Sequence, residues 1–210
     1  MKIILTATLI ICSFFTNLYA QKQVFSIIGL ENLLKKHKLV AILPIKVSVS
    51  FKRVPKGFDA ESNKSSEKKT GLNMQQGMYT YLLRKSGDYS TLFQDVDRTN
   101  ILLSKAGIMD RLDEVLPDSI AKLLGVDAII KCSYSYEKTG SEAGAIAKMI
   151  VFGYGGKVGS GSLIMQIYDG SDGALLWRFY KEMNEGVFDS GDELMERMMR
   201  KISRNFPYSK

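Results

Sequence analysis

Residues 163–181 read LIMQIYDGSDGALLWRFYK, and this stretch decides the fold. Two largely apolar runs flank a turn from Asp169 to Gly173, and Asp and Gly are residues that tight turns favour. Strand-like runs joined by such a turn predict a β-hairpin. Residues 163, 165 and 167 are apolar and share one face of the first strand, because successive side chains in a strand alternate between its faces.

The segments that precede the hairpin begin with a helix and a strand. Residues 24–34 carry apolar side chains at a spacing that suits a short helix, and Lys35 to Lys38 give this helix a basic end. Residues 39–45 form a continuous apolar run typical of a buried central strand, and Pro44 is expected to mark its end or a bulge. Alternation over 46–52 predicts a half-exposed extension of that strand.

Helices and short strands then alternate through the middle of the chain, with glycines at the expected helix ends. We expect a long flexible loop over 53–70, a helix over 72–85 ended by Gly87 and a brief strand at 92–93. A helix capped by Asp97 or Thr99 should then run to Lys105, before Gly107. A helix from Pro117 to Gly125 and a strand over 126–136 follow.

A last helix is expected from Asp189, with Ser190 and Glu193 as a capping box. Its buried stripe consists of Leu194, Met195, Met198, Met199 and Ile202. Strands and helices interleave early and a hairpin comes late. This order predicts an α/β (α+β) fold class with a single mixed β-sheet and helices packed on it.

The first 20 residues have the features of a cleavable signal peptide. Met1 and Lys2 give a positive start, residues 3–15 are almost wholly apolar, and Ala20 precedes a polar segment. An uncleaved anchor helix is the alternative, but the apolar run is shorter than the roughly 20 residues that a spanning helix needs. We therefore expect a signal peptide at 1–20, a single domain at 21–210, and a periplasmic or outer-membrane-associated protein.

The chain is basic, with a formal net charge of +7. The densest basic stretches are 35–38, 64–69 and 197–204, and we interpret them as solvated faces or loops. An exported basic protein can contact anionic lipid headgroups, so contact with the outer-membrane surface is a possible interaction. Nucleic acid is not an expected partner, because no basic motif is interleaved with aromatic residues.

The sequence offers few groups for metal or acid–base chemistry. Cys132 is the sole cysteine after the leader, and its apolar surroundings predict a buried, inert thiol. His37 is the sole histidine, and we expect it to be satisfied or solvated at the surface. These counts exclude an ordinary zinc site. Asp169 and Asp172 are expected to stabilise a turn, in preference to binding calcium.

Two acidic clusters and a glycine-rich segment are further candidates for a catalytic or binding site. The cluster 189–193 lies where a helix start favours acids, and the cluster 110–114 lies just ahead of a helix, so neither requires a catalytic role. The segment 140–161 matches neither the P-loop nor the dinucleotide-binding pattern. Residues 143–168 could form a membrane-crossing hairpin, but we favour a soluble hairpin, or a helix and strand packed on the core. We expect no catalytic, cofactor-binding or metal site.

Four segments resemble a known family. Ile120–Tyr134 resembles the helix, Gly-x-Asp turn and strand of the CsgG-like family of curli-secretion channel proteins. Ile167–Trp177 resembles the later hairpin of that group, with Asp172 in place of the usual Thr. Val40–Pro44 is similar to its first strand, and Met198–Pro207 to the terminal helix of related envelope lipoproteins.

This resemblance implies a TolB amino-terminal-like, anticodon-binding-like α/β fold, an envelope location and no catalysis. The relatives include oligomeric secretion channels and periplasmic activators of wall synthesis, so it implies other envelope proteins as partners and a possible homo-oligomer. The relatives are usually lipoproteins, whereas Ile11 before Cys12 does not suit a lipobox. The expected function is to assist secretion or assembly by protein contacts, and the alternatives are a regulatory module that activates a cell-wall enzyme and an enzyme of unrecognised type.

Overall fold

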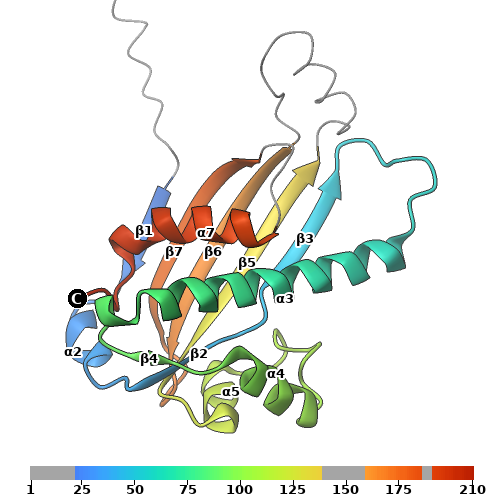
Figure 1. Cartoon of the computed structure of the whole chain (residues 1–210). Helices are drawn as coiled ribbons and strands as arrows, with labels where there is room; N and C mark the ends of the chain where they lie inside the picture. The colour runs from blue at the N-terminus through green and yellow to red at the C-terminus, as the bar shows by residue number, and fades with distance from the viewer. Residues whose placement is uncertain (1–21, 139–158, 186–190) are drawn as a thin grey trace, which may run out of the picture.

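The computed structural model describes residues 22–138, 159–185 and 191–210, and their strands form one mixed sheet (Figure 1). The strand order is β1-β7-β6-β5-β2-β4, with β3 paired to β5 beyond the end of β2. The expected α/β fold class, a single mixed sheet with helices packed on it, is confirmed. The strands are β1 (Lys22–Ser26), β2 (Leu39–Ile42), β3 (Lys46–Phe51), β4 (Leu92–Phe93), β5 (Ala128–Lys138), β6 (Gly159–Asp169) and β7 (Leu175–Glu185).

The long strand β5 holds both halves of the sheet together. On one side it pairs in parallel with β2 and then with β3, and Pro44 lies between these two strands as expected. On its other side it pairs antiparallel with β6, and β6 with β7. The predicted hairpin is thus confirmed, and Gly173 in its turn has a φ of 75°, a conformation that favours glycine.

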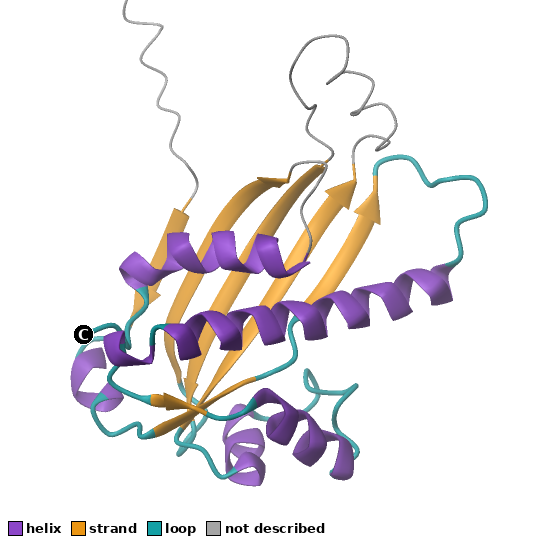
Figure 2. Cartoon of the chain, in the orientation of Figure 1, coloured by secondary structure: helices purple, strands orange, loops and turns teal. Residues whose placement is uncertain are grey.

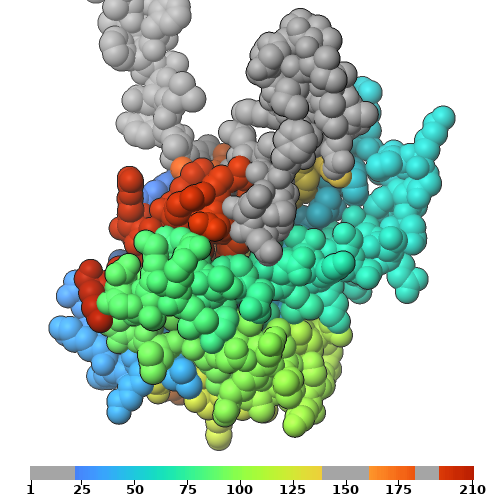
Figure 3. Space-filling view, viewed as in Figure 1, coloured from blue at the N-terminus to red at the C-terminus, as the bar shows by residue number. Residues whose placement is uncertain are grey.

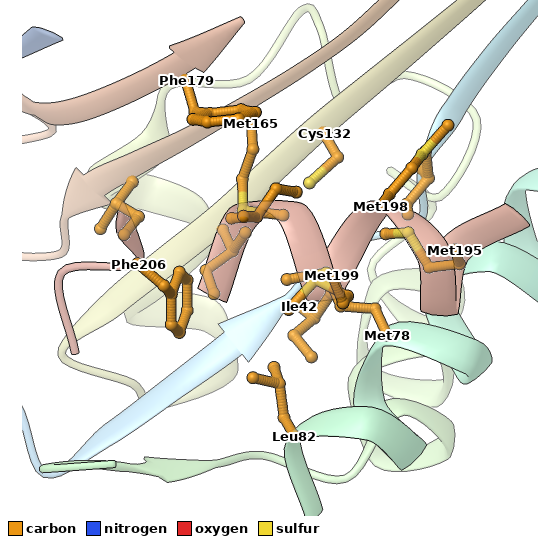
Figure 4. Packing of buried hydrophobic residues seen from close by; sticks show 14 of the residues in the cluster. Ile42, Met78, Leu82, Cys132, Met165, Phe179, Met195, Met198, Met199 and Phe206 are labelled. Carbon is orange, nitrogen blue, oxygen red and sulfur yellow. The ribbon is translucent and has the colours of Figure 1, made fainter. Parts of the chain in front are cut away.

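Two helices that are distant in sequence cover one face of the sheet (Figures 2 and 3). They are α3 (Ala60–Arg84) and α7 (Gly191–Ile202). Met78 and Leu82 of α3 and three methionines of α7 point towards the strands, as Figure 4 shows. The predicted stripe of α7 is confirmed, because its five residues are all buried: Leu194, Met195, Met198, Met199 and Ile202.

Two shorter helices cover one end of the opposite face (Figure 1). They are α4 (Val96–Lys105) and α5 (Pro117–Leu124), and their apolar side chains bury the start of β5 and the end of β2. This second cluster consists of Ala41, Leu43, Leu103, Ile120, Ala121, Leu124 and Ile129. The predicted helix from Pro117 and the strand at 92–93 are also confirmed.

The expected helix over 24–34 is wrong in its first half. Residues 22–26 form β1, which pairs antiparallel with β7, and the helix α2 is confined to Leu30–Leu34. Gly29 separates the two with a φ of 77°. Val24 and Phe25 are strong strand formers, and sheet pairing outweighed a helical spacing that was short and ambiguous.

The expected loop over 53–70 is also wrong, because α3 begins at Ala60. The Asp59 side chain accepts hydrogen bonds from the backbone N–H groups of Glu61 and Ser62 and caps the helix. The first half of α3 is polar because most of it faces solvent. In α4 the cap is Asp95, and not Asp97 or Thr99; the buried Thr99 hydroxyl donates to Gln94 instead.

The second arm of the hypothetical membrane hairpin lies inside this sheet. It forms β6, and Leu163, Met165 and Ile167 are fully buried beneath the helices. The first arm, the glycine-rich segment from Gly140 to Val158 and the capping residue Ser190 lie outside the described residues. Within the described ranges, no helix combines the length and the apolar character needed to cross a bilayer.

The packing of α3 on the sheet gives a first prediction. An alanine Cβ at Gly71 would overlap the carbonyl oxygen of Ile45, so Gly71→Ala is expected to destabilise the protein by at least about 2 kcal/mol. In an unobstructed helix the same change stabilises by about 1 kcal/mol. Urea unfolding followed by circular dichroism measures the difference. Gly87→Ala, where a Cβ meets open space, should change stability by less than about 0.5 kcal/mol; a stabilised Gly71→Ala variant would contradict this packing.

Candidate functional site: the open face of the sheet

The described helices leave much of the face of the sheet opposite α3 and α7 uncovered. Beyond the end covered by α4 and α5, its side chains form rows that run across the strands. We call this surface the open face. It comprises Gln23, Phe25, Lys46, Ser48, Ser50, Lys131, Ser133, Ser135, Glu137, Ser162, Ile164, Gln166, Arg178, Tyr180 and Glu182.

The middle row places two larger side chains at the centre of the open face. Register pairs align Ser133 of β5 with Ile164 of β6, and Ile164 with Tyr180 of β7. Both central side chains are half-buried. The Tyr180 hydroxyl donates a hydrogen bond of 2.9 Å to Glu182, and this bond raises the pKa of Tyr180, so the phenol stays neutral at physiological pH. Tyr180 thus presents a neutral ring with an oriented hydroxyl.

One adjoining row holds small hydroxyl side chains, whereas the row on the other side holds Lys131, Gln166 and Arg178. Ser48, Ser135 and Ser162 lie on neighbouring strands in one row, and Ser50 follows in the next. Small side chains leave the pleated backbone close to the surface, so another protein can approach it closely. Serine hydroxyls both donate and accept hydrogen bonds, which makes them adaptable contacts in an interface.

An acidic loop residue forms ion pairs with two lysines at the border of the open face. Asp113, in the segment between α4 and α5, pairs with Lys131 at 2.7 Å and with Lys46 at 2.5 Å. Hydrogen bonds from these two lysines lower the pKa of Asp113 to about 2. This arrangement ties the loop to the sheet and explains one member of the sequence cluster 110–114. Asp110 of the same cluster pairs with Lys68 of α3.

His37 has hydrogen-bond partners, as one of the two expectations held, but it does not lie at the surface, since its exposed fraction is 5%. Its Nδ1 lies 2.7 Å from the Tyr208 hydroxyl and its Nε2 lies 3.4 Å from Asp169. The Asp169 carboxylate also accepts from the backbone and hydroxyl of Ser171. These contacts join the segment before β2, the β6–β7 turn and the carboxyl-terminal segment.

The electrostatics of this cluster suit a structural link. Burial opposes ionisation of Asp169, but the hydrogen bonds from Ser171 and His37 outweigh it and hold its pKa below the usual range. Burial raises the pKa of the Tyr208 hydroxyl, so it stays protonated and available to His37. Both groups are committed to partners within the protein.

The remaining candidate residues have structural surroundings. Cys132 is buried and free, and burial raises the pKa of its thiol to about 12, as expected for an inert thiol. Asp172 accepts a hydrogen bond from the backbone N–H of Ala174, which confirms its role in the turn. Over the ranges that the structure describes, no group of three or more His, Cys, Asp or Glu side chains could hold a metal ion.

Sequence reasoning found only part of the open face. The polar positions of 46–52 and the pair Ser162 and Gln166 follow from strand alternation. The serines of β5 could have been found in the same way, because Ser133 and Ser135 alternate with Cys132 and Tyr134. The exposed edge strand β1 was missed, since its spacing also suited a helix.

Comparisons with known proteins add no family. No family model matches the chain, and no curated protein matches it. Among solved structures, the chain is similar to the lipoprotein GNA1162 from Neisseria meningitidis, with 12% identity, coverage of 80% of this chain and 95% of that one, and a TM-score of 0.46. The PelC dodecamer from Paraburkholderia phytofirmans gives 11% identity, coverage of 90% and 99%, and a TM-score of 0.43. The LpoB C-terminal domain from Salmonella enterica gives 11% identity, coverage of 74% of this chain and 96% of that one, and a TM-score of 0.35.

The link through His37 gives a second prediction. Tyr208→Phe removes the hydroxyl and leaves His37 Nδ1 buried without this partner, so the free energy of unfolding should fall by about 1–3 kcal/mol. Chemical denaturation measures it. Tyr180→Phe deletes the same atom at a half-exposed position and should cost less than about 0.5 kcal/mol. Equal effects of the two substitutions would refute a special role for the buried hydroxyl.

The Asp113 pairs give a third prediction. Because the folded-state pKa of Asp113 is lowered, its stabilising contribution is complete above its ordinary pKa of 3.8 and is lost as the pH falls towards 2. NMR titration of the carboxyl carbon should give a midpoint near 2. Lys131→Met should move that midpoint up towards 3.8, whereas Lys68→Met, which removes the partner of Asp110, should leave it unchanged. An unmoved midpoint in Lys131→Met would show that this pair does not govern the ionisation.

Proposed function

We propose that this protein is a non-catalytic, exported cell-envelope protein that assists secretion or assembly by binding other envelope proteins, and that the open face is its principal binding surface. The observation that carries the proposal is the uncovered area of the sheet, where Ile164 and Tyr180 lie between a row that contains serines and a row of longer polar side chains. The apolar leader expected at 1–20 supports the envelope location.

The composition of the open face suits recognition of a protein. Tyrosine is among the residues that contribute most binding energy in interfaces, especially near their centre. Tyr180 and Ile164 occupy that position, with polar and charged residues around them. Interfaces commonly combine an apolar centre with a polar rim in this way.

The polar character of the open face favours reversible binding. Obligate interfaces are more hydrophobic than transient ones, whereas most positions of the open face are serine, glutamine or charged. This observation favours the alternative expectation, a regulatory module that docks on and activates an envelope enzyme. A permanent ring of identical subunits would need a more apolar contact than this face provides.

Site-specific crosslinking tests the proposal. A photo-crosslinking amino acid at Ser135, which is exposed on the open face, should trap a discrete partner in intact cells that express the protein. The same group at Thr80, exposed on the helix-covered side, is the matched control and should trap none. Equal labelling from both positions would contradict the proposal.

Substitution at the centre of the open face gives a fourth prediction. Tyr180→Ala should weaken binding to the trapped partner at least tenfold, in line with a loss of about 1.4 kcal/mol or more for a central tyrosine. Affinity is measured with the purified pair, and thermal melting verifies that the variant is folded. Thr80→Ala should bind like the wild type. An unchanged affinity in Tyr180→Ala would remove this face from the binding surface.

A further inference from the structure

The sheet ends at β1, whose five residues are all exposed (Figure 1). This strand pairs with β7 on one side and has no partner strand on its other side among the described residues. Unpaired strand edges present backbone N–H and C=O groups that can pair with another chain. Phe25 also belongs to the open face, but the edge consists of the outward backbone groups of β1, so its role does not depend on the proposed function.

One hydrogen bond fixes which backbone groups point outwards. The N–H of Ile27 donates to the carbonyl of Leu176, so Ile27 directs its backbone groups to the neighbouring strand. Because these directions alternate along a strand, Phe25 and Gln23 also face β7. Val24 and Ser26 therefore direct their N–H and C=O groups to the open edge.

The opposite edges of the sheet are blocked, in contrast to β1. The N–H of Val49, in the middle of β3, donates a 2.7 Å hydrogen bond to the Glu67 carboxylate of α3. An added strand could not pair there without displacing this side chain. The other terminal strand, β4, has two residues. Short strands and charged side chains are common means of preventing edge pairing.

The strand β1 carries one basic side chain, Lys22, which also donates a 2.7 Å hydrogen bond to Asn205, and two apolar ones, Val24 and Phe25. Lys22 lies opposite Lys181 in the register, and Phe25 lies opposite Arg178. Each charged residue in the paired segments 22–26 and 177–181 is therefore a cation. Val24 and Phe25 are 46% and 50% exposed. The edge combines free backbone groups, positive charge and apolar surface.

We propose that the β1 edge binds an extended segment of a partner protein as an additional strand, and that this segment carries carboxylate side chains interleaved with apolar ones. Backbone hydrogen bonds supply affinity in this mode, and the side chains supply selectivity. The carboxylates lie on the face that carries Lys22 and Lys181, while the apolar residues contact Phe25 on the opposite face.

The same features argue against other occupants. A second copy added edge to edge would contribute a strand that carries Lys22 and no carboxylate, so Lys22 and Lys181 would gain no opposite charge. A lipid surface would match the charge but would leave the outward N–H groups of Val24 and Ser26 without acceptors in a defined geometry. An acidic strand satisfies both the backbone and the charge.

A synthetic peptide of alternating glutamate and valine, seven residues long with blocked ends, provides the probe. Calorimetry with the mature protein should detect 1:1 binding. The peptide with lysine in place of glutamate should bind at least tenfold more weakly, and the glutamate peptide with all backbone nitrogens methylated should not bind detectably. Equal binding of the lysine peptide, or retained binding of the methylated one, would overturn the proposal.

Substitutions on the protein side give the fifth prediction. Val24→Pro removes the outward N–H but leaves the β1–β7 ladder intact, because proline is tolerated where the N–H faces away from the sheet; it should weaken peptide binding at least tenfold. Val24→Thr keeps the N–H and should stay within about twofold of wild type. If Val24→Pro does not fold, the methylated peptide still decides the question.

The same preparation distinguishes the competing occupants. In analytical ultracentrifugation, we expect no dimer of the wild type that is lost in Val24→Pro. In vesicle sedimentation, Val24→Pro should adsorb to vesicles containing anionic lipid as strongly as the wild type does. The opposite of either result would assign the edge to a second copy or to a membrane and overturn the proposal. Tyr180→Ala, which tests the open face, should bind the peptide like the wild type, so failure of one proposal leaves the other distinguishable.

Discussion

The antiparallel pairing of β5 with β6 is the constraint on which the rest of the structure depends. The register runs without interruption from Ala128 opposite Asp169 to Lys138 opposite Gly159. Because side chains alternate, a slip of one residue in either strand would exchange its two faces. The buried Cys132 and Met165 would then face solvent, and Lys131 and Gln166 would enter the apolar core. Since β2 and β3 pair with β5, and β7 pairs with β6, this single register also aligns the other strands.

The face covered by α3 and α7 buries most of the apolar side chains of the core, and the cluster beneath α4 and α5 is smaller. Methionines from α3 and α7 meet the strands there, and methionine is flexible enough to fill irregular spaces between helices and a twisted sheet. Trp177, Phe206 and Tyr208 complete the core near the carboxyl terminus. There His37 contacts Asp169 through one ring nitrogen and the Tyr208 hydroxyl through the other. Because the apolar core lies mainly on this side, the open face can contain serines and charged residues. These polar groups would destabilise the protein if a helix covered them without satisfying their hydrogen bonds.

Local patterns allowed much of this fold to be predicted. The hairpin, the strands around Pro44, the helix from Pro117 and the stripe of α7 each have a signal within a few residues. The failures arose where distant contacts decide. The polar first half of α3 is stabilised by its Asp59 cap and by contacts to Val49 and Asp110, which lie outside the helix. His37 is buried by partners more than 130 residues away. Alternation can show that a strand has a polar face, but not that no helix covers it, because helix placement is a tertiary property.

The contrast between the edges links the two candidate surfaces. At β3 the fold uses a carboxylate, Glu67, to occupy a backbone N–H, and this device also excludes an incoming strand. At β1 no described strand pairs with the outward backbone groups, and the nearest charges along the paired strands are basic. Phe25 belongs to the edge strand by its backbone and to the open face by its side chain, opposite Arg178. A strand added at β1 would therefore extend the rows of the open face by one residue each. A partner bound across the enlarged face would contact both the sheet and the added strand. Occupation of the edge would therefore strengthen binding at the open face. By thermodynamic linkage, binding at the open face would strengthen binding at the edge to the same degree.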